Sequence, residues 1–276
     1  MIDLEGGATQ FMGGGENPVI DLHEFLDKLN PNQKINYDKI LQKMIKNWQL
    51  TTTRPKILLH SCCAPCSTYT LEYLTKYADV TVYYANSNIH PRAEYQRREY
   101  VQQKFIRDFN EKTGNNVRFL AAPYAPQQYF EAVRGLEKEP EGGDRCRACF
   151  GYRLDLVAAK AVELDFDYFG SALTISPHKN SQVVNSVGIE VQNFYTTKYL
   201  PSDFKKNGGY QRSLEMCREY DVYRQCYCGC LFAAKQQGID LAQIRREALA
   251  FMQDKDGSTE FPEIKFVYHD EREQVE

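Results

Sequence analysis

The 276-residue sequence lacks several features that would place it in a simple class of protein. No stretch approaches the roughly 18 consecutive apolar residues that a membrane-spanning helix needs. The segment 1–15 lacks the basic and apolar regions of a secretory signal peptide. The formal charges nearly cancel, at −3, so any contact with nucleic acid must come from a local basic face. We therefore expect a cytoplasmic protein without membrane contact.

The sequence also lacks internal repeats and low-complexity tracts, and its composition is that of a globular protein. Hydrophobic residues make up 42% and charged residues 26%, which excludes a largely disordered or fibrous chain. Residues 1–18 are rich in glycine and are predicted to be a flexible extension. Apolar residues spaced by three or four between Leu22 and Trp48 predict a helical extension over 19–50 that packs on the core. We expect an α/β catalytic domain over 51–240, and a helix with a charged tail over 241–276.

Within 51–240, short runs rich in branched and aromatic residues alternate with segments of helical length. The predicted strands are 57–59, 80–85, 117–122, 168–173 and 194–199. The predicted helices are 68–78, 92–112, 126–138, 147–164 and 179–187, followed by 208–221 and 230–237. This alternation predicts an α/β fold: a mainly parallel sheet with helices on both faces. Ligands bind beyond the carboxyl ends of such strands. We therefore expect functional residues in the segments that follow three of the strands, which are 60–66, 86–91 and 174–180.

Cysteine is abundant, with nine residues, and this is unusual for a compartment in which thiols stay reduced. Eight of the nine form three groups, which are Cys62, Cys63 and Cys66; Cys146 and Cys149; and Cys226, Cys228 and Cys230. A C-x-x-C pair at a turn can direct two thiolates to one metal ion, and Gly229 permits a tight bend between Cys228 and Cys230. The pattern therefore indicates metal binding.

Three interpretations of these thiols are open. A structural zinc ion needs only four ligands, and a redox-active dithiol at Cys63 and Cys66 would leave the other thiols unexplained. An iron–sulfur cluster together with a further metal ion would use more of them, so a multi-iron site fits better. Cys217 lies in a helical pattern and fits a packed apolar residue, while the role of Cys226 is ambiguous.

Six motifs between Lys56 and Cys230 together resemble the iron-dependent epoxyqueuosine reductases of the QueH type. They are LLHSCCAPCS (58–67), NSNIHPRAEYQRR (86–98), GGDRCRACFGYRL (142–154), SALTISPHKN (171–180), DFKKNGGYQRS (203–213) and YRQCYCGC (223–230). The resemblance implies that the chain reduces the epoxide of epoxyqueuosine, at the wobble position of tRNA, to queuosine. It also implies a sheet related to the HUP or PP-loop-like nucleotide-binding domains of tRNA-thiolating enzymes. The segment 60–67 lacks the glycines of a phosphate-binding loop, which disfavours the use of ATP.

The family further implies a [4Fe-4S] cluster, an additional mononuclear iron and an external electron donor. Such a cluster delivers single electrons, and an iron with an open position can bind the epoxide oxygen. The expected ligands are Cys62, Cys63, Cys146, Cys149, Cys228 and Cys230, followed by Cys66 and last by Cys226. The division of these thiols between cluster and single iron stays open.

Breaking the carbon–oxygen bond also requires a proton donor. The candidates all lie within the motifs. They are His60, Asp144, Asp203 and His178, and His90 is a further one. His60 could equally hold the backbone or a cluster sulfur, and Asp144 could cap the helix that follows it.

The expected tRNA contacts are basic side chains of the same motifs. They are Arg92, Arg97 and Arg98 in one helical segment, and Lys179, Lys205 and Lys206 near strand ends. A solvated helix face is the plain alternative for the arginines, because Glu94 and Glu99 dilute their charge. Two rival functions remain: an RNA-binding module with structural zinc, and a tRNA-sulfurating enzyme, which would depend on ATP.

Overall fold

The computed structural model describes residues 22–30 and 34–255, so the expected extension over 1–18 and the tail beyond 255 lie outside the described residues. The strands are β1 (Lys56–His60), β2 (Asp79–Tyr84), β3 (Arg118–Ala121), β4 (Tyr168–Ser171) and β5 (Lys198–Tyr199). The helices are α1 (Leu22–Asp27), α2 (Tyr37–Leu50), α3 (Ala64–Leu74), α4 (Arg92–Thr113), α5 (Pro126–Ala132), α6 (Asp144–Glu163), α7 (Ser181–Gln192), α8 (Gly209–Glu219), α9 (Leu231–Gln236) and α10 (Leu241–Lys255). A short 3-10 helix, η2 (Ala172–Ile175), follows β4.

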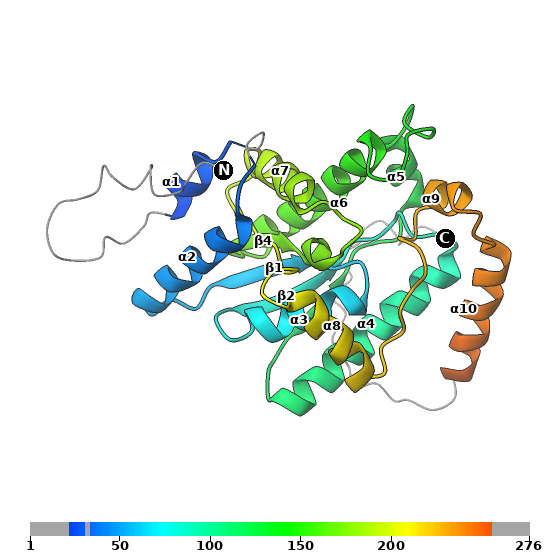
Figure 1. Ribbon diagram of the computed structural model, residues 1–276, viewed down its shortest axis with the longest axis horizontal. Coiled ribbons are helices and arrows are strands. Elements are labelled where there is room, and N and C mark those ends of the chain that lie inside the picture. The colour runs from blue at the N-terminus through cyan, green and yellow to red at the C-terminus, as the bar shows by residue number, and fades with distance from the viewer. Residues whose placement is uncertain (1–21, 31–33, 256–276) are drawn as a thin grey trace, which may run out of the picture.

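The five strands form one parallel sheet in the order β3-β2-β1-β4-β5. The central strand β1 is apolar at Ile57, Leu58 and Leu59, and these side chains have no exposed surface, as expected of a strand covered on both faces. In Figure 1, α3, α4 and α8 lie below the sheet, and α6 and α7 lie above it. The predicted α/β fold with a parallel sheet and helices on both faces is confirmed.

Most predicted elements begin or end at different residues, α5 for example at Ala132 and not at 138, and two of these differences have a clear physical cause. The strand expected over 194–199 is reduced to β5, because the backbone N–H groups of Phe194 and Tyr195 bond back to carbonyls at the end of α7 and extend its last turn. Helix α3 begins four residues earlier than the helix predicted over 68–78. Pro65 occupies its first turn and Cys63 its N-cap position, so the thiols of Cys63 and Cys66 lie at the start of a helix.

Added helices pack at both ends of this domain (Figure 1). Helix α2 buries the predicted apolar face from Ile40 to Trp48, and the Trp48 ring lies 5.5 Å from the ring of Tyr168 in β4. At the other end, α10 packs along α4, where the rings of Tyr100 and Phe251 meet. The side chains of Leu22 and Phe25, also in the predicted pattern, are outside the described ones.

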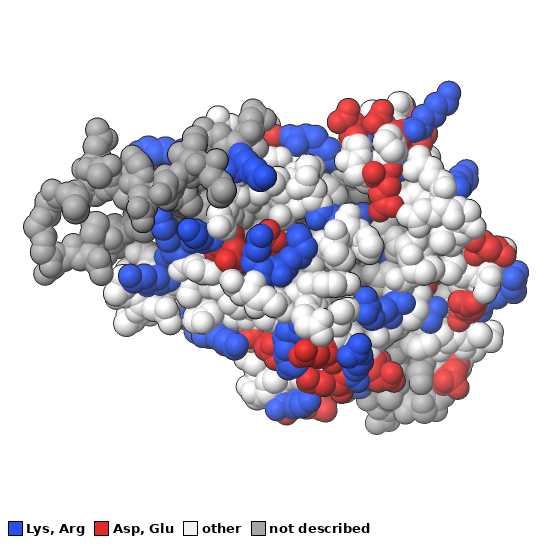
Figure 2. Space-filling view, in the orientation of Figure 1, with Lys and Arg blue, Asp and Glu red and all other residues white. Residues whose placement is uncertain are grey.

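The surface and the helix lengths agree with the small net charge and the absence of long apolar runs. On the face drawn in Figure 2, basic and acidic side chains are interspersed. Among the described residues, no helix combines the length and apolarity needed to span a bilayer.

The strand order reverses between β1 and β4. Strands β2 and β3 are added on one side of β1, and β4 and β5 are then added on its other side. His60 and Ser171 are register partners at the carboxyl ends of these two strands. A switch of this kind leaves a crevice between the loops that leave the two strands. The loop after β1 carries the first cysteine group, so the fold places these thiols at the expected binding edge.

Candidate metal centre

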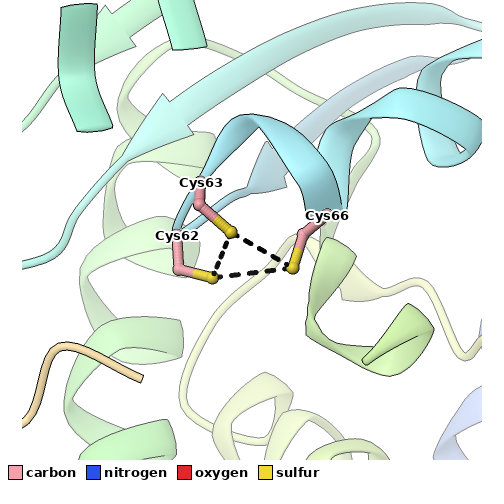
Figure 3. A group of neighbouring side chains, drawn as sticks. All are labelled: Cys62, Cys63 and Cys66. Atoms are coloured by element: carbon pink, nitrogen blue, oxygen red, sulfur yellow. Dashed lines mark hydrogen bonds between the residues drawn. The ribbon is translucent and has the colours of Figure 1, made fainter. Parts of the chain in front are cut away.

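The first cysteine group lies at the junction of β1 and α3. Figure 3 shows the sulfur atoms of Cys62, Cys63 and Cys66 pointing toward one another. The Cys63 sulfur lies 3.4 Å from each of the other two sulfurs, and those two are 3.8 Å apart. All three side chains are buried, and their positions allow them to hold a metal ion together. The free N–H groups at the start of α3 also favour thiolate charge here.

The second group lies at the start of α6. Cys146 and Cys149 are three residues apart in its first two turns, which places their thiols on one side of the helix. The backbone N–H of Gly142 donates to the Cys146 sulfur at 3.2 Å. Gly142 has φ +92°, in the left-handed region, so the loop before α6 turns to direct this N–H toward the sulfur.

The third group lies in the loop 226–230, which several contacts hold against α4. Arg98 donates from Nη1 to the carbonyl of Cys228 at 3.1 Å and from Nη2 to the carbonyl of Tyr227 at 3.2 Å. Ile89 forms an isolated bridge with Cys230, and the N–H of His90 donates to the Gly229 carbonyl at 2.8 Å. The loop therefore has a defined position although it contains no regular structure.

The three groups meet at one cavity of about 470 Å³. Its lining includes seven thiols, which are those of Cys62, Cys66, Cys146, Cys149, Cys226, Cys228 and Cys230. Cys63 contacts two of them, so all eight clustered cysteines belong to this site. Cys217 is buried elsewhere, as a packed residue of the main core. The volume falls in the range of about 300–1,000 Å³ that is common for small-molecule sites.

Cationic side chains and a tyrosine surround these thiols. Arg153 and Lys179 line the cavity; burial lowers the pKa of each, but neighbouring thiolate charge raises it more, so both stay protonated. The Tyr129 hydroxyl lies 3.3 Å from the Cys230 sulfur. The pKa of Cys230 falls to about 5, mainly through its hydrogen bond with Cys228 and further through Tyr129. Anionic sulfur is thus favoured at Cys230, and also at Cys63, whose pKa is lowered by hydrogen bonds from Cys62 and Cys66. Hydrogen bonds between thiols or burial instead raise the pKa of other site thiols, which are Cys62, Cys66, Cys149 and Cys228.

The structure separates the four predicted catalytic residues. His178 lines the cavity and has an exposed side chain. Asp144 is exposed at the first position of α6, outside the cavity lining, and Gly143, not Asp144, is the N-cap residue. Asp203 also lies outside the lining, where its carboxylate accepts from Ser181 and pairs with Lys205.

His60 is fully buried at the carboxyl end of β1, two residues before Cys62. Its Nδ1 lies 3.2 Å from Ser171 Oγ and its Nε2 lies 3.2 Å from Asn86 Oδ1. Burial lowers the pKa of His60 to about 3, with a further contribution from the charge of Arg153. Since an amide oxygen can only accept, the neutral ring carries its proton on Nε2 and accepts from Ser171. His60 is thus a neutral support at the end of β1, which disagrees with its predicted role as a proton donor.

The predicted tRNA-binding residues also divide. Arg98 is 1% exposed and pairs with Glu94 at 2.7 Å, so the expectation that it contacts tRNA is wrong for this arrangement: it holds the loop 226–230 instead. Arg97 stacks 3.5 Å from the ring centroid of Tyr223 and is covered by Phe251 of α10. Arg92 and Lys206 are exposed, and Lys205 donates to the carbonyls of Thr174 and Lys179 near the cavity.

The sequence analysis missed several residues of the cavity. Arg145, Arg153, Asn88 and Gln225 lie in the quoted motifs without an assigned role, and Tyr129 lies outside those motifs. The spacing of Arg145, Cys149 and Arg153 by four residues places them on one helix face, so this signal was available. Gln225 donates to the Cys63 sulfur at 2.9 Å, a contact that no local pattern predicts.

Fold and site together define a class: a parallel α/β protein with a cysteine-lined site at its topological switch point, three of whose thiols can hold a metal ion. A family model described as "Epoxyqueuosine reductase QueH" matches residues 57–236, which is more than half of the chain. The chain belongs to the QueH family.

Relatives of the same name cover most of the chain. One from Streptococcus pyogenes serotype M1 is 68% identical over 250 residues, covering 91% of this chain and 98% of the relative. One from Staphylococcus epidermidis is 58% identical over 237 residues, covering 85% and 99%. One from Acinetobacter baylyi is 39% identical over 189 residues, covering 68% and 84%. Each is named epoxyqueuosine reductase QueH.

Proposed function

We propose that this chain reduces the epoxide of epoxyqueuosine, at the wobble position of tRNA, to the alkene of queuosine. The convergence of three cysteine groups on one cavity, in a member of the QueH family, carries this proposal. The reaction removes one oxygen atom as water and consumes two electrons and two protons. A tRNA substrate assigns the reaction to the cytoplasm, with electrons from an external donor.

The donor set fits a multi-iron centre. Eight thiols exceed the four ligands of a single zinc ion, and soft thiolates favour iron–sulfur clusters. Asn88 lines the same cavity at 2% exposure, and its Oδ1 has no hydrogen-bond partner among the described residues, which supports a further polar occupant of the cavity. We assign a [4Fe-4S] cluster and an adjacent mononuclear iron to Cys62, Cys63, Cys66, Cys146, Cys149, Cys228 and Cys230.

When bound, the cluster supplies single electrons and the adjacent iron a Lewis acid. The residues of the chain supply the rest. His178 and Lys179 lie at the cavity, where a proton can reach the breaking carbon–oxygen bond. Of the five candidate proton donors, we retain His178 because it lines the cavity and the other four, His90 among them, do not.

The basic residues near the cavity are the proposed tRNA contacts. Lys205 bonds to the loop that carries Lys179, and the exposed Lys206 follows it. Arg92 is exposed at the start of α4, 5.8 Å from the ring of Tyr124. The proposed tRNA contacts are therefore Arg92, Lys179, Lys205 and Lys206. Arg97 and Arg98 are no longer among them, because they pack against other side chains of the protein.

Anaerobic purification followed by iron and sulfide analysis and an assay on epoxyqueuosine-containing tRNA tests the function. We expect an iron–sulfur protein that forms queuosine without ATP. A colourless protein with one zinc ion and no turnover would instead support an RNA-binding module, and turnover that requires ATP would support tRNA sulfuration.

Two cysteine variants make the test specific to the site. Cys146→Ala should lose iron and turnover together, because its thiol lines the cavity. Cys217→Ala is the matched control, since this thiol is equally reduced but packs in the core away from the cavity. Full iron and normal turnover in Cys146→Ala would remove Cys146 from the site.

A further inference from the structure

Arg153 is a buried cation at the cavity that has no carboxylate partner in the described part of the chain. It is 4% exposed and lies in α6, one turn after Cys149. Its Nε donates to the Cys149 carbonyl at 3.2 Å, and its two terminal amino groups find no acceptor among the described residues. A buried charge is costly unless it is paired, so the compensating charge must lie within the cavity that Arg153 lines.

The terminal amino groups of the other cations of this region have acceptors in the protein, although Arg145 also lacks a carboxylate partner among the described residues and its Nε has no partner there. Arg98 pairs with Glu94, and Lys179 pairs with Glu141 at 2.8 Å. Arg145 donates to the backbone carbonyls of Glu137 and Glu139. Arg153 therefore differs from them in that neither of its terminal amino groups has an acceptor in the described part of the chain, while its side chain lines the cavity.

The negative groups around Arg153 come from all three cysteine groups. Thiolate charge at Cys149, Cys62 and Cys228, in this order of effect, raises the pKa of its guanidinium, against the lowering by burial. These residues belong to α6, to the β1–α3 junction and to the loop 226–230. A centre bound by these thiols would thus carry its negative charge around one fixed positive charge.

We propose that Arg153 is a positioning residue that compensates the negative charge of the metal–thiolate centre and thereby raises its reduction potential. This inference rests on the proposed function. One electron from an external one-electron donor adds one negative charge to the centre, while Arg153 keeps its proton. Attraction to the guanidinium stabilises the reduced form more than the oxidised form, so the electron is accepted more readily.

The test is a redox titration of full-length, iron-loaded protein with dithionite, followed by visible absorption and electron paramagnetic resonance. Arg153→Gln should shift the midpoint potential to more negative values. Arg153→Lys keeps the charge and should remain close to the parent protein. Arg147→Gln is the matched control, because Arg147 lies on the same helix but pairs with Glu190 outside the cavity lining, and it should leave the potential unchanged.

The outcomes separate this inference from the proposed function. Iron-loaded Arg153→Gln with an unchanged potential would overturn the inference alone. If Arg153→Gln does not fold, Arg153→Lys decides: a potential near that of the parent supports compensation by charge, and a clear negative shift overturns it. A parent protein without redox-active iron would overturn both the inference and the proposed function.

Discussion

At the scale of the single residue, burial changes the chemistry of His60. The ring lies between Ser171 and Asn86, two residues before Cys62 in the chain, and burial lowers its pKa to about 3. Neutral histidine provides two directional hydrogen bonds without adding a second buried charge near Arg153. This arrangement fixes the carboxyl end of β1, where Cys62 and Cys63 follow.

The shifted pKa of His60 predicts an acid-dependent loss of stability. In the unfolded chain the ring protonates near pH 6.5, whereas in the folded protein it stays neutral down to about pH 3. The contribution to stability is thus complete above pH 6.5 and is lost as the pH falls toward 3. Through this residue alone, the free energy of unfolding should be about 2 kcal/mol lower at pH 5 than at pH 7.

Urea unfolding at both pH values, under reducing conditions, measures this effect. His60→Gln should have the smaller dependence on pH, by about 2 kcal/mol. His178→Gln, at an exposed position, should retain the dependence of the parent protein. Equal pH dependence in His60→Gln and the parent would refute the neutral buried state.

At the scale of the element, the loop 226–230 shows how a segment without regular structure is held in place. Its carbonyls accept from Arg98, its backbone pairs with Ile89, and the Tyr227 hydroxyl donates to the carbonyl of His90. Arg98 is in turn fixed by Glu94 one turn earlier in α4. The position of Cys228 and Cys230 therefore depends on a helix that is distant in sequence.

Gly229 gives a prediction for this loop. It has φ +102°, and an added Cβ would lie 2.8 Å from Ile89 Cγ1 and 3.1 Å from Arg98 Nη1. Gly229→Ala should combine backbone strain with displacement of the loop, lowering the free energy of unfolding by about 2–4 kcal/mol and reducing the iron content.

Gly238→Ala is the matched control for this variant. Gly238 also has a positive φ, of +67°, but an added Cβ meets nothing within 4 Å. Gly238→Ala should lower the free energy of unfolding by about 1–2 kcal/mol, and the protein should keep its iron. Urea unfolding of the metal-free proteins and iron analysis of the loaded proteins make the comparison. Equal stability losses and full iron content in both variants would show that the loop tolerates displacement.

The elements differ in how far the sequence predicts them. Alternating strands and helices were predictable, because β1 is a short apolar run and α4 carries a long helical pattern. The short length of β5 was not predictable. Phe194 and Tyr195 have strand propensity, but their backbone N–H groups donate to carbonyls at the end of α7. The role of Arg98 was also beyond local reasoning: a basic residue between acidic neighbours suggests a solvated helix face, and only packing against the loop buries it.

At the scale of the whole molecule, the sheet explains part of the convergence of thiols. Parallel strands bring the segments after β1 and β4 to one edge, so the positions of Cys62 and His178 follow from the predicted fold. Cys146 and Cys228 follow no strand, and only their tertiary contacts bring them to the cavity. From the sequence, their membership of the site followed from their grouping and the family resemblance.

The distribution of basic residues gives a prediction for the molecule as a tRNA-binding surface. If Lys206 contacts a phosphate, Lys206→Gln should weaken tRNA binding and lower the slope of log K against log salt concentration by about 0.7–0.9. Lys76→Gln is the matched control, because this exposed lysine precedes β2 at the opposite edge of the sheet, and its slope should match that of the parent. Filter binding or fluorescence anisotropy over a series of salt concentrations measures both. Identical slopes for all three proteins would exclude Lys206 from the interface and leave Arg92, Lys179 and Lys205 as the phosphate contacts to be tested.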